Sequence, residues 1–302
     1  MWQLYSLVAL FFGATEEVID KATMVESKAI GLLAAAWIRN TIAFAISIVA
    51  AILIGGTLPN IIISLPIVTL GVLYGIGAIT YTLVLKQVEI TASSIMTSFI
   101  PLVFLPIDLF ILDTHLFPLQ IAGIFVLVLG AVIFFYRGKH TVSITKKQML
   151  MLVLIFLFDA LLIGFESYLF KDYFITLHLS ETDFLVSMWG SMFLFLTLLV
   201  VGQALYKRKL PIMQLHTRYM RGSFFSKVTD YGNSFFFLKA LSIASASQVT
   251  SMKVFYPIVL LAIVVGTQKR LTVNLEETLD RRALVSKAFG IIIICLGAFL
   301  VS

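Results

Sequence analysis

Charged residues are scarce in this chain of 302 residues: Asp, Glu, Lys and Arg make up 13% of it, against 60% for hydrophobic residues. This balance excludes an ordinary water-soluble domain, in which about a quarter of the residues are charged. The mean hydropathy is +1.03. The apolar residues gather in runs of about 20, which as helices cross a hydrocarbon core of about 30 Å. We therefore expect an all-α integral membrane protein.

Cysteine is almost absent, and the single one, Cys295, excludes a disulfide within the chain. Histidine is rare, and the scattered positions give no metal-binding constellation and no base that could activate a serine at membrane depth. These positions are His115, His140, His178 and His216. The chain also lacks the Gly-x-x-x-x-Gly-Lys-Ser/Thr loop of ATP-binding proteins. We expect no enzyme, no cofactor and no metal.

Ten hydrophobic runs are present instead. Because the bilayer core holds no water, runs of this length must be helices that satisfy their own backbone hydrogen bonds. The predicted spans are approximately 2–24, 30–54, 64–85, 90–112, 117–136, 148–170, 182–205, 222–240, 246–267 and 284–301. The first run has no basic segment before it and contains acidic residues, so we interpret it as a helix and not as a signal peptide.

Two matching series of residues run along the chain. The first is Leu85-Lys86, Pro101, Gly123 and Gly130, and the second is Leu238-Lys239, Pro257, Gly290 and Gly297. Each half holds five runs, and an odd number makes the two copies enter the membrane in opposite directions. We predict two inverted five-helix repeats, 1–136 and 148–302, joined by a basic loop at 137–147. This architecture is common in secondary transporters.

Basic residues concentrate near alternate predicted turns, those after the first, third, fifth, seventh and ninth runs. They include Arg39, Lys86, Arg137, Lys147, Lys207, Arg221, Lys227 and Arg281. Lys and Arg are enriched on the cytoplasmic side of membrane proteins. We therefore predict a multi-pass protein of the plasma membrane, or bacterial inner membrane, with both termini outside the cytoplasm. Topology accounts for the basic clusters, so nucleic acid is not an expected partner.

Several stretches resemble one family of membrane proteins. They are Trp37-Ile38-Arg39, Leu85-Lys86 followed by Thr91–Ser94 and Pro101, and Leu238–Leu241 followed by Ser245–Ser247 and Pro257. Together with the closing glycine pairs, they make the chain similar to the drug/metabolite transporter superfamily, specifically its ten-helix EamA-like branch. The resemblance covers nearly the whole chain. It implies ten transmembrane helices in two inverted repeats and a transport activity, but it supplies no substrate.

Ionisable side chains within a span cost roughly 2.5–3.5 kcal/mol each on insertion scales, so each needs a partner or a function. Glu16 and Asp20 are four residues apart, on one face of the first helix. Asp159 and Glu166 are seven apart, on one face of the sixth. We interpret these carboxylates as sites for a coupling proton or for a cationic group of a substrate. The alternative is that Glu16 is a helix-end residue whose carboxylate reaches the interface.

Lys253 breaks the match between the two copies, because Thr97 stands at the equivalent place in the first. A charge present in only one copy is what an asymmetric ligand requires. We expect Lys253 to bind an anionic group of the substrate or, in the empty site, to pair with Glu166, Asp159 or Asp230. The alternative is that Lys253 is only the structural partner of one buried acid.

Polar and aromatic residues near these charges complete the expected site. Asp230 and Tyr231 belong to a polar run of the eighth helix that cannot face lipid cheaply, and Trp189 occupies an early position in the seventh. A cavity lined by such residues suits a small amphipathic molecule. Gly71 and Gly75, in the third helix, are expected to permit close helix packing.

Together these features predict a secondary transporter that moves a small organic metabolite, favoured as an amino acid or similar zwitterion, by alternating access. It would be proton-coupled or facilitative, and a homodimer is left open. The alternative among transporters is an exporter of cationic hydrophobic drugs. The alternative from a different class is a lipid flippase or a membrane scaffold without flux.

Overall fold

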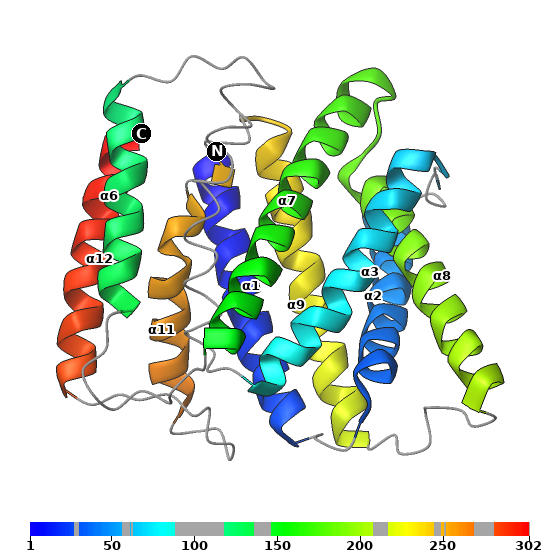
Figure 1. Cartoon of the computed structure of the whole chain (residues 1–302). Helices are drawn as coiled ribbons and strands as arrows, with labels where there is room; N and C mark the ends of the chain where they lie inside the picture. Colours follow the sequence, from blue (N-terminus) through cyan, green and yellow to red (C-terminus); the bar gives the residue numbers. More distant parts are fainter. Residues whose placement is uncertain are drawn as a thin grey trace.

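The structure is a computed structural model that describes residues 1–26, 30–55, 61, 63–87, 118–135, 146–207, 217–244, 249–250, 252–268 and 281–301. All regular secondary structure in these ranges is helical, which confirms the expected all-α class. The elements are α1 (Trp2–Glu26), α2 (Leu32–Gly55), α3 (Leu65–Gln87), α6 (Pro118–Phe135), α7 (Lys146–Thr176), α8 (Glu181–Lys207), α9 (Thr217–Leu241), the 3-10 turn η1 (Met252–Phe255), α11 (Tyr256–Gln268) and α12 (Arg281–Val301). They form one bundle with both chain ends at the same end of it (Figure 1).

Helices occupy the predicted spans as far as the described residues extend. The span predicted at 90–112, with Thr97 and Pro101, lies outside these residues. Within the described part of the chain, three helices are long and apolar enough to cross a membrane, namely α2, α3 and α8. The full count of ten spans stays a prediction, as does the division of the chain at 137–147.

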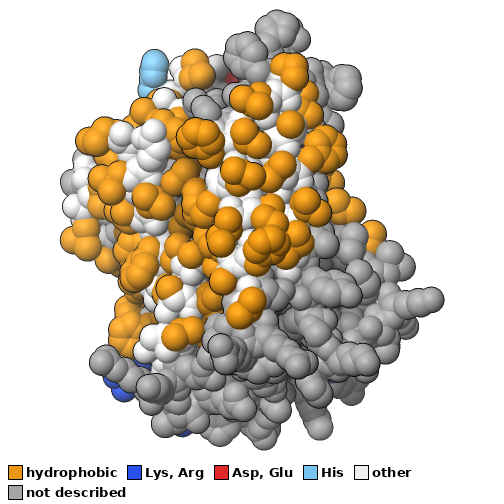
Figure 2. Space-filling model, turned by 90° about the vertical axis from the view of Figure 1, so that its left-hand side faces the viewer, with side chains coloured by type: hydrophobic (Ala, Val, Ile, Leu, Met, Phe, Trp, Pro, Cys, Tyr) orange, Lys and Arg blue, Asp and Glu red, His pale blue; other side chains and the backbone are white. Residues whose placement is uncertain are grey.

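The outer surface of the bundle is strongly apolar. Exposed side chains of α6 and α12 include Phe125, Leu129, Phe289, Ile292 and Phe299. On the side where these two helices lie, hydrophobic side chains cover much of the described surface (Figure 2). A soluble monomer rarely exposes so continuous an apolar surface.

Glycines bring α1 and α9 into close antiparallel contact. Gly13 of α1 lies against Asn233, and Thr23, further along α1, lies against Gly222 at the start of α9. Because the numbers rise along α1 as they fall along α9, the two helices run in opposite directions. A Cβ at Gly13 would stand 3.2 Å from the Asn233 side chain, so only a glycine allows this spacing without a shift.

The pair formed by α3 and α7 is antiparallel in the same way. The hydroxyls of Ser64, just before α3, and Tyr173, near the end of α7, share a hydrogen bond of 2.7 Å. Further along α3, Gly77 lies beside Asp159, which comes earlier in α7. This pairing places the acidic face of α7 against α3.

The long apolar helix α8 packs on both α2 and α3. Trp37 of α2 donates from Nε1 to Oγ1 of Thr197 at 2.9 Å, and Gly190 of α8 lies against the Phe44 ring. At Gly71 of α3, a Cβ would stand 2.8 Å from the backbone nitrogen of Met192. The predicted role of Gly71 in close helix packing is therefore confirmed.

The helices α6 and α12 pack against each other (Figure 1). Gly130 of α6 lies against the backbone of α12, where a Cβ would stand 2.7 Å from the nitrogen of Ile294 and 3.1 Å from the oxygen of Gly290. Two of the glycines that the sequence series singles out thus meet at one helix crossing.

Candidate functional site

A cavity of about 360 Å³ lies inside the bundle. Side chains from α1, α2, α3, α7, α8, α9 and the η1–α11 segment line it. The predicted site residues among them are Glu16, Asp159, Glu166, Trp189, Asp230 and Lys253. Residues scattered over the whole sequence therefore come together at one place, whose volume fits a small organic ligand.

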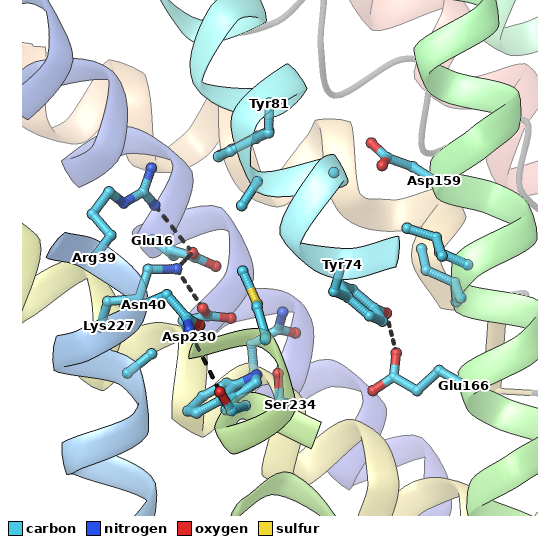
Figure 3. A pocket seen from close by; sticks show the side chains of 18 of the residues that line it. Glu16, Arg39, Asn40, Tyr74, Tyr81, Asp159, Glu166, Lys227, Asp230 and Ser234 are labelled. Carbon is cyan, nitrogen blue, oxygen red and sulfur yellow. Dashed lines mark hydrogen bonds and ion pairs between the residues drawn. The ribbon is translucent and has the colours of Figure 1, made fainter. Parts of the chain in front are cut away.

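One side of the cavity carries a cluster of opposite charges centred on Lys227 of α9. The Lys227 ammonium lies 3.0 Å from Oε1 of Glu16 in α1 and also contacts Oδ2 of Asp230, one turn along α9. From α2, the Arg39 guanidinium approaches Glu16 to 3.8 Å. Figure 3 shows these four side chains gathered on one side. The ion pairs join three helices, and each buried charge has an opposite charge beside it.

Asp20 belongs to this cluster but does not line the cavity. Its side chain is 1% exposed, and its carboxylate accepts hydrogen bonds from Arg39 and from the hydroxyl of Ser226. Asp20 thus lies behind the wall, where it holds Arg39 in place. The sequence predicts it as a binding residue, whereas this position suits a structural partner.

Glu166 stands across the cavity from the cluster, on α7. The hydroxyl of Tyr74 on α3 donates a hydrogen bond to its Oε2, and the carboxylate is buried (Figure 3). Glu166 therefore has a neutral donor where Glu16 has a cation. The hydrogen bond ties α3 to α7 at the level of the cavity.

Asp159 lies seven residues before Glu166 on the same helix. Its Oδ1 is 3.7 Å from the place where a Cβ of Gly77 would stand, an ordinary van der Waals distance, so the carboxylate lies directly beside α3. Among the described residues, no side chain forms a hydrogen bond or an ion pair with it. Figure 3 shows it apart from the charge cluster.

Lys253 enters the cavity from η1. Its Nζ lies 4.3 Å from the ring centroid of Phe237 on α9, a cation–π contact that replaces part of the lost hydration. The sequence predicts a pair with Glu166, Asp159 or Asp230. Within the described part of the chain Lys253 forms no ion pair, and Glu166 acts on it only at longer range. The predicted pairing is therefore absent in this structure.

Trp189 lines the cavity, whereas Tyr231 supports it from behind. The two rings meet edge to face with centroids 5.9 Å apart. Tyr231 is buried, and its hydroxyl has no hydrogen-bond partner among the described residues. The amide of Asn40 donates to the backbone oxygen of Trp189 at 3.5 Å. Tyr231 therefore positions Trp189 and does not itself reach the cavity.

The sequence uses Arg39 and Lys227 only as indicators of topology near predicted turns, within the spans 30–54 and 222–240, and does not predict that they line the cavity. Arg39 is 5% exposed within α2, and Lys227 lies within α9 with its side chain 12% exposed. Tyr74 was not singled out at all. One signal could have found it, because Tyr74 precedes Lys227 by 153 residues, the same offset that relates Leu85-Lys86 to Leu238-Lys239.

Among the described residues, no group of three or more His, Cys, Asp or Glu could hold a metal ion.

No protein-family model matches the chain, and no curated protein matches it. Solved structures do resemble it. One chain, described only as the crystal structure of a protein, aligns over 100% of this chain and 96% of its own length, with a TM-score of 0.72 and 13% sequence identity. At this identity the likeness concerns the fold alone.

Proposed function

We propose that this chain is a secondary transporter that moves a small zwitterionic metabolite, favoured as an amino acid, through the cavity by alternating access. One observation carries the proposal. The cavity holds one carboxylate, Asp159, and one ammonium, Lys253, to which no described side chain forms an ion pair or a hydrogen bond. An α-amino acid carries the two complementary charges, and buried charges are stable only when such partners are present.

The membrane setting is supported by the apolar outer surface and by the three helices long enough to cross a bilayer. A cavity that charged side chains line within such a bundle suits a solute pathway, because charged side chains within a membrane face the bundle interior. We extend this to ten spans on the strength of the hydrophobic runs.

The inverted repeat is supported by the way the helices pair. If α7 is the second copy of α1 and α9 the second copy of α3, then the pairs α1–α9 and α7–α3 are one pairing made twice. Two further pairs, α2–α8 and α6–α12, would then join equivalent helices of the two halves. A twofold axis in the membrane plane relates halves in this manner. We keep the resemblance to the EamA-like branch within the proposal.

The zwitterion proposal is tested by Lys253→Ala and Asp159→Asn. Each removes one charge that the ligand is expected to meet, so each should weaken amino-acid binding at least tenfold. The measurement is a thermal-shift titration of the purified full chain with a panel of amino acids, followed by counterflow in liposomes for those that bind.

Lys239→Ala is the matched control. Lys239 is a lysine of α9 that does not line the cavity, and its side chain is 40% exposed beside Glu181. Its removal should leave amino-acid affinity within twofold of the unaltered protein. Equal loss in Lys253→Ala and Lys239→Ala would contradict a direct role for Lys253.

Export of cationic hydrophobic molecules is the second candidate, and the charge balance of the wall favours it. The acids lining the cavity are Glu16, Glu17, Asp159, Glu166 and Asp230, against the bases Arg39, Lys227 and Lys253. Under this alternative, Lys253→Ala leaves the transport of a lipophilic cation such as tetraphenylphosphonium intact, whereas Asp159→Asn abolishes it. A protein that is folded and moves neither class of solute would instead be a scaffold or would act on lipids.

A further inference from the structure

At the cavity wall, the Lys227 ammonium contacts two carboxylates at the same time. Its Nζ lies 3.0 Å from Oε1 of Glu16 and contacts Oδ2 of Asp230. The three side chains are 12%, 14% and 21% exposed for Lys227, Glu16 and Asp230. With so little water available to them, the charges depend on one another for stability.

The other basic groups that line the cavity are engaged elsewhere. Arg39 contacts Asp20 closely and approaches Glu16 only to 3.8 Å. Lys253 lies over the Phe237 ring. Among the described residues, Lys227 is therefore the cation on which both Glu16 and Asp230 depend.

The matched position in the other half shows what is special about this lysine. Tyr74 stands 153 residues before Lys227 and donates to Glu166 as Lys227 donates to Glu16. Both acids thus receive a hydrogen bond from the matched position, but only one receives a positive charge. The hydrogen bond is common to the two halves, and the charge is what differs.

We propose that Lys227 determines the charge class of ligand that the cavity accepts. Its ammonium fills, from within the protein, the place between Glu16 and Asp230 that a second cationic group of a ligand would occupy. This proposal rests on the proposed function. Under this proposal, the cavity prefers zwitterions with an uncharged side chain. Loss of Lys227 would allow diamino acids to bind.

Three amino acids of nearly equal length test this rule, because they differ in the charge at the end of the side chain. Lysine carries a positive group, norleucine a methyl group and 2-aminoadipate a negative group. Their dissociation constants are measured by calorimetry on the full chain in detergent, for the unaltered protein and for Lys227→Gln. The glutamine keeps a hydrogen-bond donor for Glu16 and removes the charge. Lysine should then gain at least tenfold in affinity relative to norleucine.

Two control variants separate charge from hydrogen bonding. Lys227→Arg keeps the positive charge and should leave the lysine-to-norleucine affinity ratio within threefold of that of the unaltered protein. Tyr74→Phe removes the matched hydrogen bond on the other side without a change of charge, so it should move both affinities together.

If Lys227→Gln does not fold, a variant that removes a negative charge from the cluster can be tested instead. Asp230→Asn leaves Lys227 with one carboxylate fewer, so 2-aminoadipate should gain at least tenfold relative to norleucine. Suppose that norleucine binding depends on Lys253, but neither Lys227→Gln nor Asp230→Asn changes its affinity ratio relative to norleucine by more than threefold. The rule for Lys227 is then wrong and the proposed function stands. If the unaltered protein binds none of the three, the zwitterion function fails and the rule fails with it.

Discussion

At the scale of single residues, Asp20 links the charge cluster to the packing of the bundle. It is 1% exposed and accepts from Arg39 and Ser226, side chains of two different helices. Removing one member of a buried ion pair is far more costly than removing both, because the remaining charge has no partner and little water. Asp20 therefore bears on stability, in contrast to the residues that face the cavity.

Asp20→Asn should lower the free energy of unfolding by about 3–5 kcal/mol, the cost typical of breaking a buried pair. The double variant Asp20→Asn/Arg39→Gln should recover a large part of this loss. Chemical denaturation in detergent, followed by tryptophan fluorescence, measures both. Asp172→Asn, at an exposed position of α7, is the control and should change little. A double variant no more stable than Asp20→Asn alone would contradict the ion-pair explanation.

The charged residues of the site were largely predictable, and the reason is energetic. Charges within an apolar run are so costly that Glu16, Asp159, Glu166 and Lys253 attract notice from the sequence alone. Their gathering into one cavity follows, because lipid excludes them. Tyr74 escaped notice because an aromatic ring can face lipid, core or cavity, and no sequence pattern in a helix that is apolar on all sides separates the three.

At the scale of the helices, glycines set the distances between neighbours. Gly71 brings α3 within contact of the α8 backbone, whereas at Gly202, later in α8, nothing lies within 4 Å of the place where a Cβ would stand. Replacement by alanine is therefore expected to have opposite effects on stability at these two positions.

Gly71→Ala should reduce the free energy of unfolding by about 1–3 kcal/mol, since α3 and α8 must separate to admit the methyl group. Gly202→Ala should be neutral or should stabilise by up to about 1 kcal/mol, because alanine favours the helix. The midpoint of thermal unfolding in detergent, read from tryptophan emission, gives both values. Similar losses at the two positions would show that contact with α8 is not the cause.

The approximate extent of most described helices was also predictable, because the length of an apolar run is fixed by the hydrocarbon that it crosses. The exceptions are α7, which continues to Thr176 beyond the predicted 148–170, and α11, which begins only at Tyr256 in the predicted span 246–267. The place of Arg39 and Lys227 at the cavity was not predictable in this way. Basic residues near turns are explained by topology alone. Their acidic partner on a neighbouring helix becomes visible only when α1, α2 and α9 are packed together.

At the scale of the whole molecule, both ends of the chain lie at one end of the bundle (Figure 1). Basic residues at the opposite end include Lys207 at the end of α8 and Arg218 and Arg221 at the start of α9. By the positive-inside rule, we expect that basic end to face the cytoplasm and the termini to face outward.

Reporter fusions check this orientation. Alkaline phosphatase joined after residue 302 should be active, because it matures only outside the cytoplasm. Green fluorescent protein at the same place should not fluoresce, because it matures only in the cytoplasm. A tag before Met1 should be cleaved by protease added to intact cells. Fluorescence at the C-terminus would reverse the orientation, and opposite results at the two ends would require an odd number of spans.

The four-residue turn η1 governs which way Lys253 points. A 3-10 helix advances by about 120° per residue and an α-helix by about 100°. The three steps from Lys253 to Tyr256 therefore complete one full turn, and both side chains line the same cavity. In α-helical geometry the same steps would leave Lys253 about 60° away around the axis. A change of helix type within this single turn would therefore turn the Lys253 side chain by about 60° relative to Tyr256.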